Sequence, residues 1–385
     1  MTIWRLLLTE IRDILGNPAI SLTVIGGMLF YAFLYPQPYL NQVPRGQKIA
    51  VLDNDDSPMS RRLIRMVGAT AQVDVVSQAT SLEDAKRLLE RSAVSGVLRV
   101  PENFYRDILL HRSPTLVYAG DASYFLVYGT IIKGITAAAN ALDEEIRLVQ
   151  DSLAGQGGPV PLALNLQPVF NPNTGYLNYV IPAVFLLVLH QTLVIAAGIH
   201  ATTRKAQRIA GVTVYGGQVS ILAELCLRLA AFMVIYLPFT LFYYGWCFET
   251  YQIYRLADPG ELFHVIVPFL LAAAALGTLI GKLIPRKELV TLTVLVSSIP
   301  LLFTAGFIWP KSAIPRWING LVQWVPFTHA ANVAQQLNQM GADFLACTRE
   351  FGLLWGLFAV YFMGSILLYQ QNRQRGAGRV NTNPH

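Results

Sequence analysis

Residues 176–199 read YLNYVIPAVFLLVLHQTLVIAAGI, a run that contains no Asp, Glu, Lys or Arg. A helix of about 20 apolar residues is long enough to cross the hydrocarbon core of a bilayer. Five further apolar runs of similar length occur, at about 18–36, 218–246, 263–284, 289–309 and 351–370. The sequence therefore predicts an α-helical integral membrane protein with six transmembrane helices.

The composition agrees with this prediction. Of the 385 residues, 54% are hydrophobic and only 14% are charged, whereas soluble domains carry roughly 25% charged residues. The net charge of +6 comes from short basic clusters between the apolar runs, so it indicates membrane topology and no nucleic-acid partner. The three cysteines have no metal-ligand spacing.

Basic residues are distributed unevenly between the apolar runs. If the N-terminus is cytoplasmic, the cytoplasmic segments hold eleven of them: Arg5, Arg12, Arg204, Lys205, Arg208, Lys282, Arg286, Lys287, Arg373, Arg375 and Arg379. The short outer loops hold four: Arg255, Lys311, Arg316 and Arg349. Because basic segments stay in the cytoplasm, we expect both termini there, with residues 371–385 as a cytoplasmic tail.

Residues 1–17 have an amphipathic pattern. Ile3, Leu7, Ile11 and Ile14 share one helical face, and Gly16-Asn17-Pro18 ends the pattern before the first span at 18–36. This predicts an interfacial helix on the inner membrane surface; a simple extension of the first span is the alternative.

Residues 37–175 are too long and polar for a connection, and they read as an extracytoplasmic α/β domain between the first and second transmembrane helices. We expect strands at four places: Lys48–Asp53, Val73–Val76, Val94–Val100 and Thr115–Tyr118. Ser57-Pro58 and Ser81 have the pattern of helix starts. The domain ends in a long helix over 121–150.

The long helix has a heptad pattern of apolar residues, which are Phe125, Tyr128, Ile132, Ile135, Ala139, Leu142, Ile146 and Val149. This stripe either packs on the domain's own sheet or pairs with a second copy or an adaptor protein.

Several stretches resemble metal-binding or phosphate-binding motifs, but the spacing of their residues does not match those motifs. The acidic turn Asp53–Asp56 has Pro58 and Ile64 where an EF-hand needs Gly and Glu, so it reads as a strand-to-helix turn. Gly277–Lys282 is too short for a phosphate loop, and it reads as a Gly-xxx-Gly packing face, as does Gly352-xxx-Gly356. We predict no catalytic, cofactor-binding or metal-ligating residue in this chain.

Two sets of polar residues lie within the apolar runs. Glu224 and Arg228 are one helical turn apart near the cytoplasmic end of the third span, so they are expected to form an intramembrane charge pair. The pair is either structural or transmits cytoplasmic motion. His190 is expected to make an interhelical hydrogen bond or to line a polar path.

Residues 306–329 are aromatic and amphipathic, but Pro310, Pro315 and Pro326 interrupt them. We predict one or two short helices that dip into the outer leaflet and return, which would form a re-entrant outer gate that includes Trp309. Cys247 and Cys347 both fall near the outer face, where an oxidising compartment permits a disulfide.

Three stretches carry a family resemblance: Gly306–Pro310, Ile314–Trp317 and Trp324–His329. Together with Ile49–Asp55, Gly96–Phe104 and Asn17-Pro18, they make the chain similar to the permease subunits of ABC-2-type exporters, in the branch with a large ectodomain.

The resemblance implies a bacterial inner-membrane subunit that pairs with a second permease copy or homologue and with a cytoplasmic ABC ATPase. That ATPase would hold ATP and Mg. The implied cargo is hydrophobic or amphipathic, such as a drug or a lipid, and a periplasmic adaptor sometimes takes part alongside membrane lipid.

The resemblance also implies that the loop Thr202–Gly217, with Arg204, Lys205 and Arg208, docks on the ATPase. This loop lacks the acidic residues that many relatives carry there, so the contact chemistry differs or a second, non-identical permease contributes. The alternative function is a non-transporting membrane scaffold whose ectodomain binds a cell-surface or secretion partner.

Overall fold

The computed structural model describes residues 3–40, 44–110, 112–120, 125–154, 175–212, 215, 219–306 and 308–380. Phe307, residues 155–174 at the end of the predicted extracytoplasmic domain, and the side chains of Arg373, Arg375 and Arg379 lie outside this description. The chain forms two compact units, one of residues Met1–Leu40 with Pro168–His385 and one of residues Asn41–Gln167.

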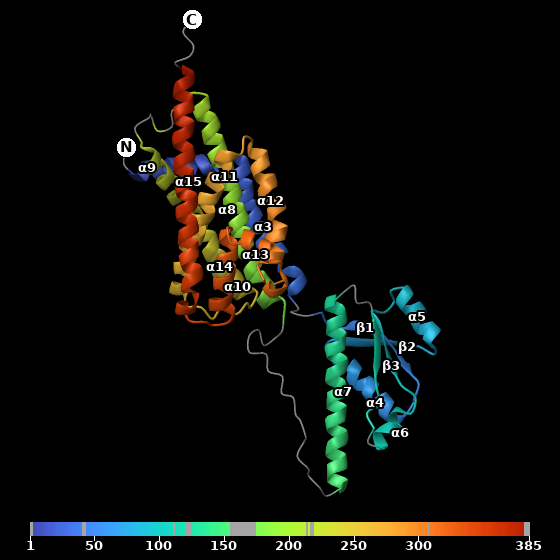
Figure 1. The fold of residues 1–385 in the computed structure, drawn as a ribbon. Coiled ribbons are helices and arrows are strands. Elements are labelled where there is room, and N and C mark those ends of the chain that lie inside the picture. The colour runs from blue at the N-terminus through green and yellow to red at the C-terminus, as the bar shows by residue number, and fades with distance from the viewer. Residues whose placement is uncertain are drawn as a thin grey trace. The chain divides into compact units, whose positions relative to one another are not determined.

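The first unit is a helical bundle (Figure 1). Within the described residues, six of its helices are long and apolar enough to cross a membrane: Pro18–Tyr39, Leu177–Ile209, Ile221–Thr250, Pro259–Leu283, Lys287–Thr304 and Phe344–Gln370. These spans match the six apolar runs of the sequence. The second unit, Asn41–Gln167, falls in the sequence between the first and second spans.

Some spans consist of more than one helical element. The first contains α2 (Pro18–Ser21), a π-helical segment η1 (Leu22–Gly27), α3 (Met28–Leu34) and η2 (Gln37–Tyr39). The third contains α9 (Ile221–Leu241), the π-helical η4 (Phe242–Cys247) and α10 (Phe248–Thr250). The others are α8 (Leu177–Ile209), α11 (Pro259–Leu283), α12 (Lys287–Thr304), and η7 (Phe344–Cys347) with α15 (Thr348–Val380).

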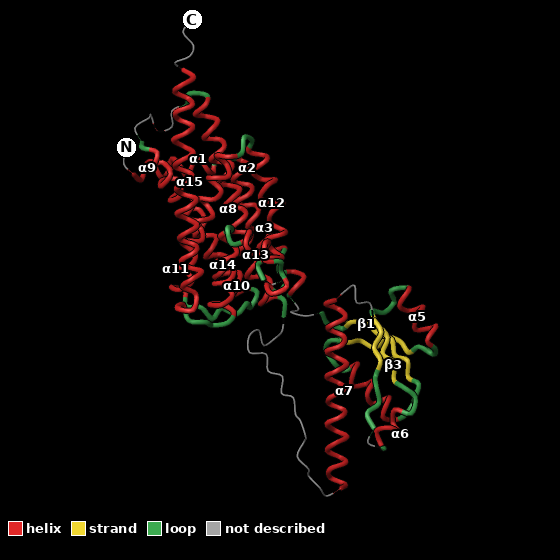
Figure 2. The backbone as a smooth tube through the Cα atoms, viewed as in Figure 1, coloured by secondary structure: helices red, strands yellow, loops and turns green. Residues whose placement is uncertain are grey.

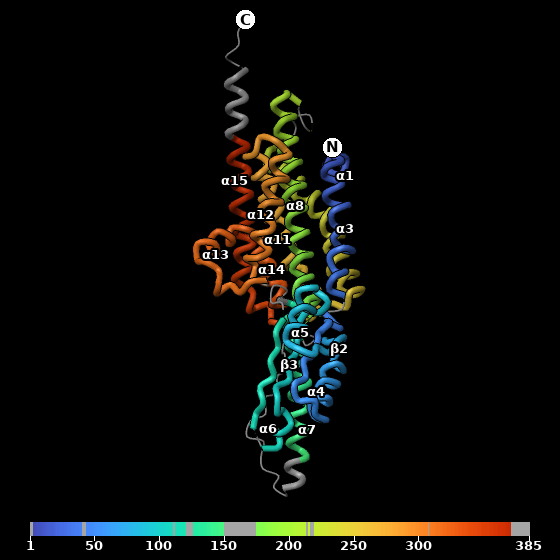
Figure 3. Tube along the Cα trace, turned by 90° about the vertical axis from the view of Figure 1, so that its right-hand side faces the viewer, coloured from blue at the N-terminus to red at the C-terminus, as the bar shows by residue number. Residues whose placement is uncertain are grey.

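Helix α8 runs through the middle of the bundle (Figure 3), and 94% of its most apolar stretch is buried. Its contact with α11 is close because glycines at the interface have no side chain that would separate the two backbones. A Cβ added to Gly281 would lie 2.2 Å from the carbonyl oxygen of Gly198, and one added to Gly277 would lie 2.5 Å from that of Val194. The predicted packing face at Gly277 and Gly281 is therefore confirmed.

The matching prediction for Gly352 and Gly356 on α15 does not hold within this chain. Among the described residues, nothing lies within 4 Å of a Cβ built at either position. A Gly-xxx-Gly pattern identifies a surface that allows close approach, but the fold decides whether a helix of the same chain occupies it.

Helix α1 (Ile3–Leu15) precedes the first span and is separate from it. Asn17 accepts a hydrogen bond of 3.1 Å from the backbone N–H of Ala19, which caps the start of α2. Ile14 is fully buried, and Leu7 and Ile11 pack against the bundle core. The apolar face of α1 thus lies against the other helices of the bundle.

Residues 306–329 form short helices, as their prolines predict. They comprise η5 (Lys311–Ala313), α13 (Arg316–Val322) and the first residues of α14 (Pro326–Ala334). Pro310 and Pro315 are the N-cap residues of η5 and α13, and Pro326 is the first residue of α14. Helix α13 lies at the flank of the bundle (Figure 3), and Trp309 is 55% exposed. The π-helical η6 (Gln335–Gln339) continues α14.

The second unit is an α/β domain with a four-stranded sheet in the order β2-β1-β3-β4 (Figure 2). Its strands are β1 (Gln47–Asp53), β2 (Val73–Gln78), β3 (Gly96–Val100) and β4 (Val117–Gly120). Strand β1 is parallel to β2 and β3, whereas β4 is antiparallel to β3. Strands β1 and β3 are flanked on both sides and are largely buried, β1 at Ile49–Leu52 and β3 at all residues except Arg99.

Helices cover both faces of the sheet. One face packs on α4 (Pro58–Gly68), α6 (Phe104–Leu109) and α7 (Phe125–Ala154), and the other packs on α5 (Leu82–Glu90). The predicted helix starts are confirmed, since the hydroxyls of Ser57 and Ser81 accept from the backbone N–H of Ser60 and Asp84.

The acidic turn after β1 is structural, as predicted. Asp53 Oδ1 accepts from the backbone N–H groups of Asp55 and Asp56 at 3.1 Å, and its Oδ2 accepts from the Ser60 hydroxyl at 2.7 Å. The carboxylate is thereby used to hold the strand-to-helix turn.

Helix α7 buries a stripe that differs in part from the heptad prediction. Ile131, Ile135, Ala138 and Leu142 are its buried apolar residues, whereas the predicted Ile132 and Val149 are 36% and 54% exposed. The buried stripe keeps the predicted spacing of three and four residues, but Ile131 and Ala138 take the places of the predicted Ile132 and Ala139.

Candidate functional site: a buried charge network

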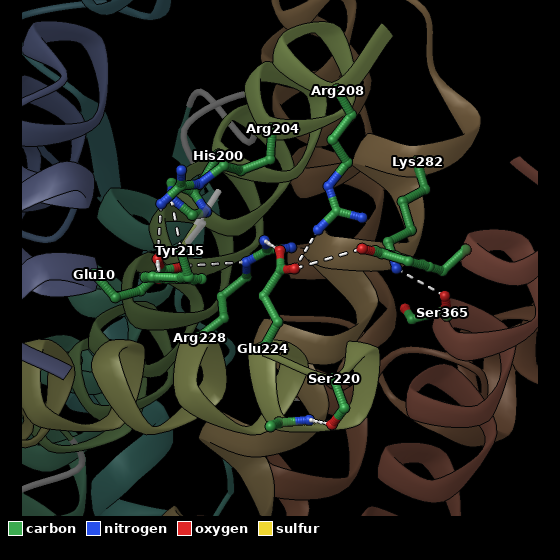
Figure 4. Close-up of polar contacts among 12 residues, drawn as sticks. Glu10, His200, Arg204, Arg208, Tyr215, Ser220, Glu224, Arg228, Lys282 and Ser365 are labelled. Carbon is green, nitrogen blue, oxygen red and sulfur yellow. Dashed lines mark hydrogen bonds and ion pairs between the residues drawn. The ribbon is translucent and has the colours of Figure 1, made fainter. Parts of the chain in front are cut away.

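The most unusual polar group in the first unit is the carboxylate of Glu10 on α1, which is completely buried. Arg204 Nη2 donates to its Oε2 at 2.8 Å, and Arg228 Nε donates to its Oε1 at 3.4 Å (Figure 4). The Tyr215 hydroxyl also donates to Oε2. A carboxylate without water must be paired in this way, because removing it from solvent costs several kcal/mol.

Two further groups complete the surroundings of Glu10. His200 Nε2 lies 3.7 Å from Oε1, and Arg204 also contacts Asp13 Oδ2 at 2.6 Å. Burial and the hydrogen bond to Glu10 raise the pKa of Tyr215, so its phenol keeps the proton that it donates. Helix α1 is thus attached by one residue to both α8 and α9.

The predicted pair of Glu224 and Arg228 is present and extends this arrangement. Arg228 Nη2 donates to Glu224 Oε1 at 2.9 Å, and Arg208 donates to Glu224 Oε2. The Arg208 guanidinium lies 4.1 Å from the ring centroid of Tyr369, a cation–π contact with α15. Arg228 therefore bridges two buried carboxylates, one on α1 and one on α9.

Lys282 extends the same group of residues to α11. Its Nζ donates to the carbonyl oxygen of Ser365 at 2.7 Å and lies 5.0 Å from the Tyr369 ring centroid. Lys205 Nζ donates to the carbonyl oxygen of Lys282 at 2.7 Å. We use the term charge network for these residues together: Glu10, His200, Arg204, Lys205, Arg208, Tyr215, Glu224, Arg228, Lys282 and Tyr369.

One part of the charge network has the spacing of a metal site. Ligand atoms of Glu10, Asp13 and His200 all lie within 4.8 Å of one another. However, Arg204 Nη2 already contacts both carboxylates, and Arg228 contacts Glu10 from the other side. Two guanidinium groups therefore occupy the position where a cation would bind, and the arrangement fits ion pairing within the chain rather than a metal ion.

The structure places the three predicted ATPase-contacting residues differently from the prediction. Helix α8 continues to Ile209, so Arg204, Lys205 and Arg208 lie on its last turns and not in a loop that starts at Thr202. The Arg204 side chain is only 10% exposed, and Lys205 and Arg208 have partners within the chain. Of the predicted loop Thr202–Gly217, residues 213, 214, 216 and 217 lie outside the described residues.

The exposed surface at this end of α8 is apolar instead. Ile209 is 79% and Val212 is 53% exposed. Gly211, with φ of +79°, lets the backbone N–H of Val212 bond the carbonyl of Gln207 while its own N–H bonds that of Arg208, both at 3.0 Å. This C-terminal cap fixes Val212 beside the helix end. We call Ile209 and Val212 the apolar tip. The basic composition of the predicted loop gave no indication of this exposed apolar surface.

The predicted outer gate is held by contacts to α15 and α14. His329 is buried, with Nδ1 against Glu350 and Nε2 at 2.8 Å from the carbonyl oxygen of Gln323. The Tyr361 hydroxyl donates to the carbonyl oxygen of Trp324. Trp309 and the three prolines shape the backbone here, while these buried polar residues connect it to the bundle.

Two other predictions need correction. Cys247 and Cys347 are both buried free thiols, and the Cys347 thiol donates to Gln336 Oε1 at 3.1 Å, so the structure has no disulfide between them. His190 lies between the rings of Phe269 and Phe327, and neither of its nitrogens has a hydrogen-bond partner within the described residues. The expected interhelical hydrogen bond is therefore absent there.

The chain is similar to known membrane transport proteins over most of its length. A family model described as "ABC-2 family transporter protein" matches residues 19–367. The chain is 19% identical over 346 residues to the probable multidrug ABC transporter permease YbhR of Escherichia coli (strain K12), covering 87% of this chain and 89% of the relative. It is 20% identical over 388 residues to the inner membrane transport permease YhhJ of the same strain, covering 96% and 97%.

Proposed function

The chain belongs to the ABC-2 family of transporter proteins, and from this premise we propose that it is the membrane-spanning permease subunit of an ATP-driven exporter. Its cargo would be a hydrophobic or amphipathic molecule. The word multidrug in the name of the relative YbhR supports this class of cargo. A separate ATPase subunit would bind ATP and Mg, and a second permease copy or homologue would complete the transporter.

The proposed orientation follows from the excess of basic residues. Arg5, Arg12 and the basic end of α8 would face the cytoplasm of a bacterial inner membrane, because positively charged segments remain there. The α/β domain of residues 41–167 would then be periplasmic. The exposed Leu148 of α7 would offer an apolar contact to a periplasmic adaptor.

The observation that carries the mechanism is the buried carboxylate of Glu10, which joins α1 to α8 and α9. A rigid-body push on α8 would have to move α1 and α9 with it, since separating Glu10 from Arg204 and Arg228 would leave buried charges unpaired. Through Arg208 and Lys282, α15 and α11 would follow. The charge network would thus make the helices move together when the ATPase acts.

The proposed contact with the ATPase is the apolar tip of Ile209 and Val212, because the basic residues behind it are engaged within the chain. ATP would favour one of two arrangements of the bundle. Cargo would be released only if it binds the two arrangements with different affinity, since a ligand with equal affinity shifts no equilibrium.

The test is reconstitution of the permease and its ATPase in liposomes, with ATP hydrolysis and dye export measured together. Ile209→Asp should abolish co-purification of the ATPase. Glu10→Gln should keep co-purification and lower export relative to ATP hydrolysed. Glu249→Gln, which removes an exposed carboxylate, is the matched control. Export that needs no ATP would refute the proposal of an ATP-driven exporter. Normal co-purification of the ATPase with the Ile209→Asp variant would refute the proposed contact at Ile209 and Val212.

A further inference from the structure

The α/β domain contains a cavity that the proposed transport function does not use. The cavity has a volume of about 300 Å³ and lies between α4, α6, α7 and residues 112–116. Its size is at the lower end of the range of small-molecule binding pockets, about 300–1,000 Å³. All of its lining residues belong to the second unit.

The floor of the cavity is apolar. Leu63, Phe104 and Leu142 line it and are 1%, 4% and 3% exposed, so they come from the core of the domain. Ile108 and Leu116 are partly buried beside them. Water in contact with such a floor is unfavourable, and an apolar chain that replaces it gains about 25 cal/mol per Å² of apolar surface covered.

The mouth of the cavity is polar and mainly cationic. Its charged lining residues are Arg112, Arg147 and Asp143, so two guanidinium groups face one carboxylate. Arg147 Nη2 contacts Asp143 Oδ2 at 2.6 Å, and Arg112 Nη1 lies 3.7 Å from Asp107 Oδ1. The Arg112 and Arg147 side chains remain 65% and 46% exposed, which leaves donors free for a carboxylate.

The cavity is held open by the way α7 is fixed. At Gly134 the helix is close to the sheet, since an added Cβ would lie 2.8 Å from Val73 Cγ2. Farther along, Arg62 Nε of α4 donates to Glu145 Oε2 of α7 at 3.0 Å. Helix α7 therefore has contacts at both ends of the stretch that borders the cavity, so the site exists before a ligand arrives.

From these observations we propose that the cavity binds a long-chain carboxylate, that is, a fatty acid. The acyl chain lies against Leu63, Phe104 and Leu142, and the carboxylate binds Arg112 and Arg147. The single negative charge of the ligand balances the lining residues, which are two arginines and one aspartate; Asp107, which also contacts Arg112, does not line the cavity. This inference concerns a ligand of the α/β domain and goes beyond the proposed transport function.

The experiment uses the full chain in phosphatidylcholine nanodiscs. The probe is palmitic acid with a photoactivatable diazirine near the end of its chain, and labelled peptides are located by mass spectrometry. We expect saturable labelling within residues 104–116 and 139–147. Ala139→Trp, which fills the cavity from α7, should remove this labelling, with a thermal unfolding curve to verify that the domain is folded.

A second variant tests the head group without changing the floor. Arg112→Gln with Arg147→Gln should weaken palmitate binding about tenfold or more, because both charge-assisted hydrogen bonds to the carboxylate are lost. Arg65→Gln with Arg91→Gln removes two exposed charges of the same domain and should leave binding unchanged. Labelling confined to the membrane-spanning helices, equal labelling of Ala139→Trp, or stronger labelling by a lysophosphatidic acid probe would overturn the proposal.

Discussion

Arg204 on α8 donates a hydrogen bond of 2.8 Å to the carboxylate of Glu10 on α1, although 194 residues separate the two along the chain. Water cannot take the place of either partner in this hydrogen bond, because Glu10 is fully buried and the Arg204 side chain is only 10% exposed. Arg228 and Tyr215 contact the same carboxylate. One side chain of the first helix therefore holds charged groups of two other helices.

We expect Glu10→Gln to destabilise the protein strongly. The substitution keeps the shape of the side chain but leaves Arg204 and Arg228 without their shared counter-charge, and breaking a buried ion pair costs roughly 3–5 kcal/mol. Asp13 and Glu224 still contact these arginines, so a value near 3 kcal/mol is expected. Thermal unfolding in detergent measures the change.

The same pair offers a double-mutant test. Arg204→Met in the Glu10→Gln background should restore part of the lost stability, since it removes one of the two guanidinium groups that lose Glu10 as a counter-charge. Glu249→Gln, at an exposed position, should change the unfolding temperature little. A wild-type unfolding temperature in Glu10→Gln would contradict the structural role of the carboxylate.

Gly281→Ala should push α8 and α11 apart. The new Cβ would lie 2.2 Å from the carbonyl oxygen of Gly198, and backbone does not yield as a flexible side chain does. Such overpacking costs about 1–3 kcal/mol. Gly356→Ala on α15 is the matched control, because its Cβ meets open space and alanine is the better helix former; equal effects of the two substitutions would argue against the close contact.

The cysteines should all react as thiols. We expect protein that is purified without a reductant and then unfolded to react with three equivalents of maleimide, because all three cysteines are free. Cys347→Ser should then give two. A single reactive thiol in the wild type, rising to three after reduction, would mean that Cys247 and Cys347 are bonded in the isolated protein.

Tyr118 should make the stability of the α/β domain depend on pH in the alkaline range. Burial, with a smaller effect of Tyr128, raises the pKa of Tyr118 to about 12 from 10.0. Because the folded state favours the protonated phenol, its contribution is complete below pH 10 and is lost as the pH rises toward 12. Between pH 10 and pH 12 the free energy of unfolding should fall less steeply for Tyr118→Phe than for the wild type.

At neutral pH the same substitution should not destabilise the domain. The Tyr118 hydroxyl is buried over Gly96 and Gly120 and has no hydrogen-bond partner among the described residues, so phenylalanine loses little there. A loss of more than about 1 kcal/mol at pH 7 would mean that the hydroxyl does have a partner.

The spans and the helix caps could be predicted from the sequence because their signals are local. An apolar run such as 176–199 is unfavourable in water whatever surrounds it, and Ser57 and Ser81 cap helices through residues only three positions away. The strands of the α/β domain are equally local, and the predicted and observed positions differ by a few residues.

Interactions between distant residues were not predictable in the same way. The sequence shows that Arg204 and Arg208 are basic and lie near a span, which suggested a surface role, but their partners are Glu10 and Glu224. The exposed Ile209 gave no signal, because a single exposed apolar residue next to a basic cluster is ordinary on a protein surface. Gly352 and Gly356 show that a Gly-xxx-Gly motif does not identify the helix that packs against it.

The buried position of Glu10 also imposes an order on biogenesis. Glu10 leaves the ribosome first, but Arg204 follows 194 residues later and Arg228 follows 218 residues later. At about 5–20 residues per second, the first of these intervals lasts about 10–40 s. Until Arg228 has been made, the carboxylate lacks one of the two arginines that contact it in the folded bundle. The nascent N-terminal helix must therefore wait in water or among lipid head groups and can take its final place only after the third span has been made.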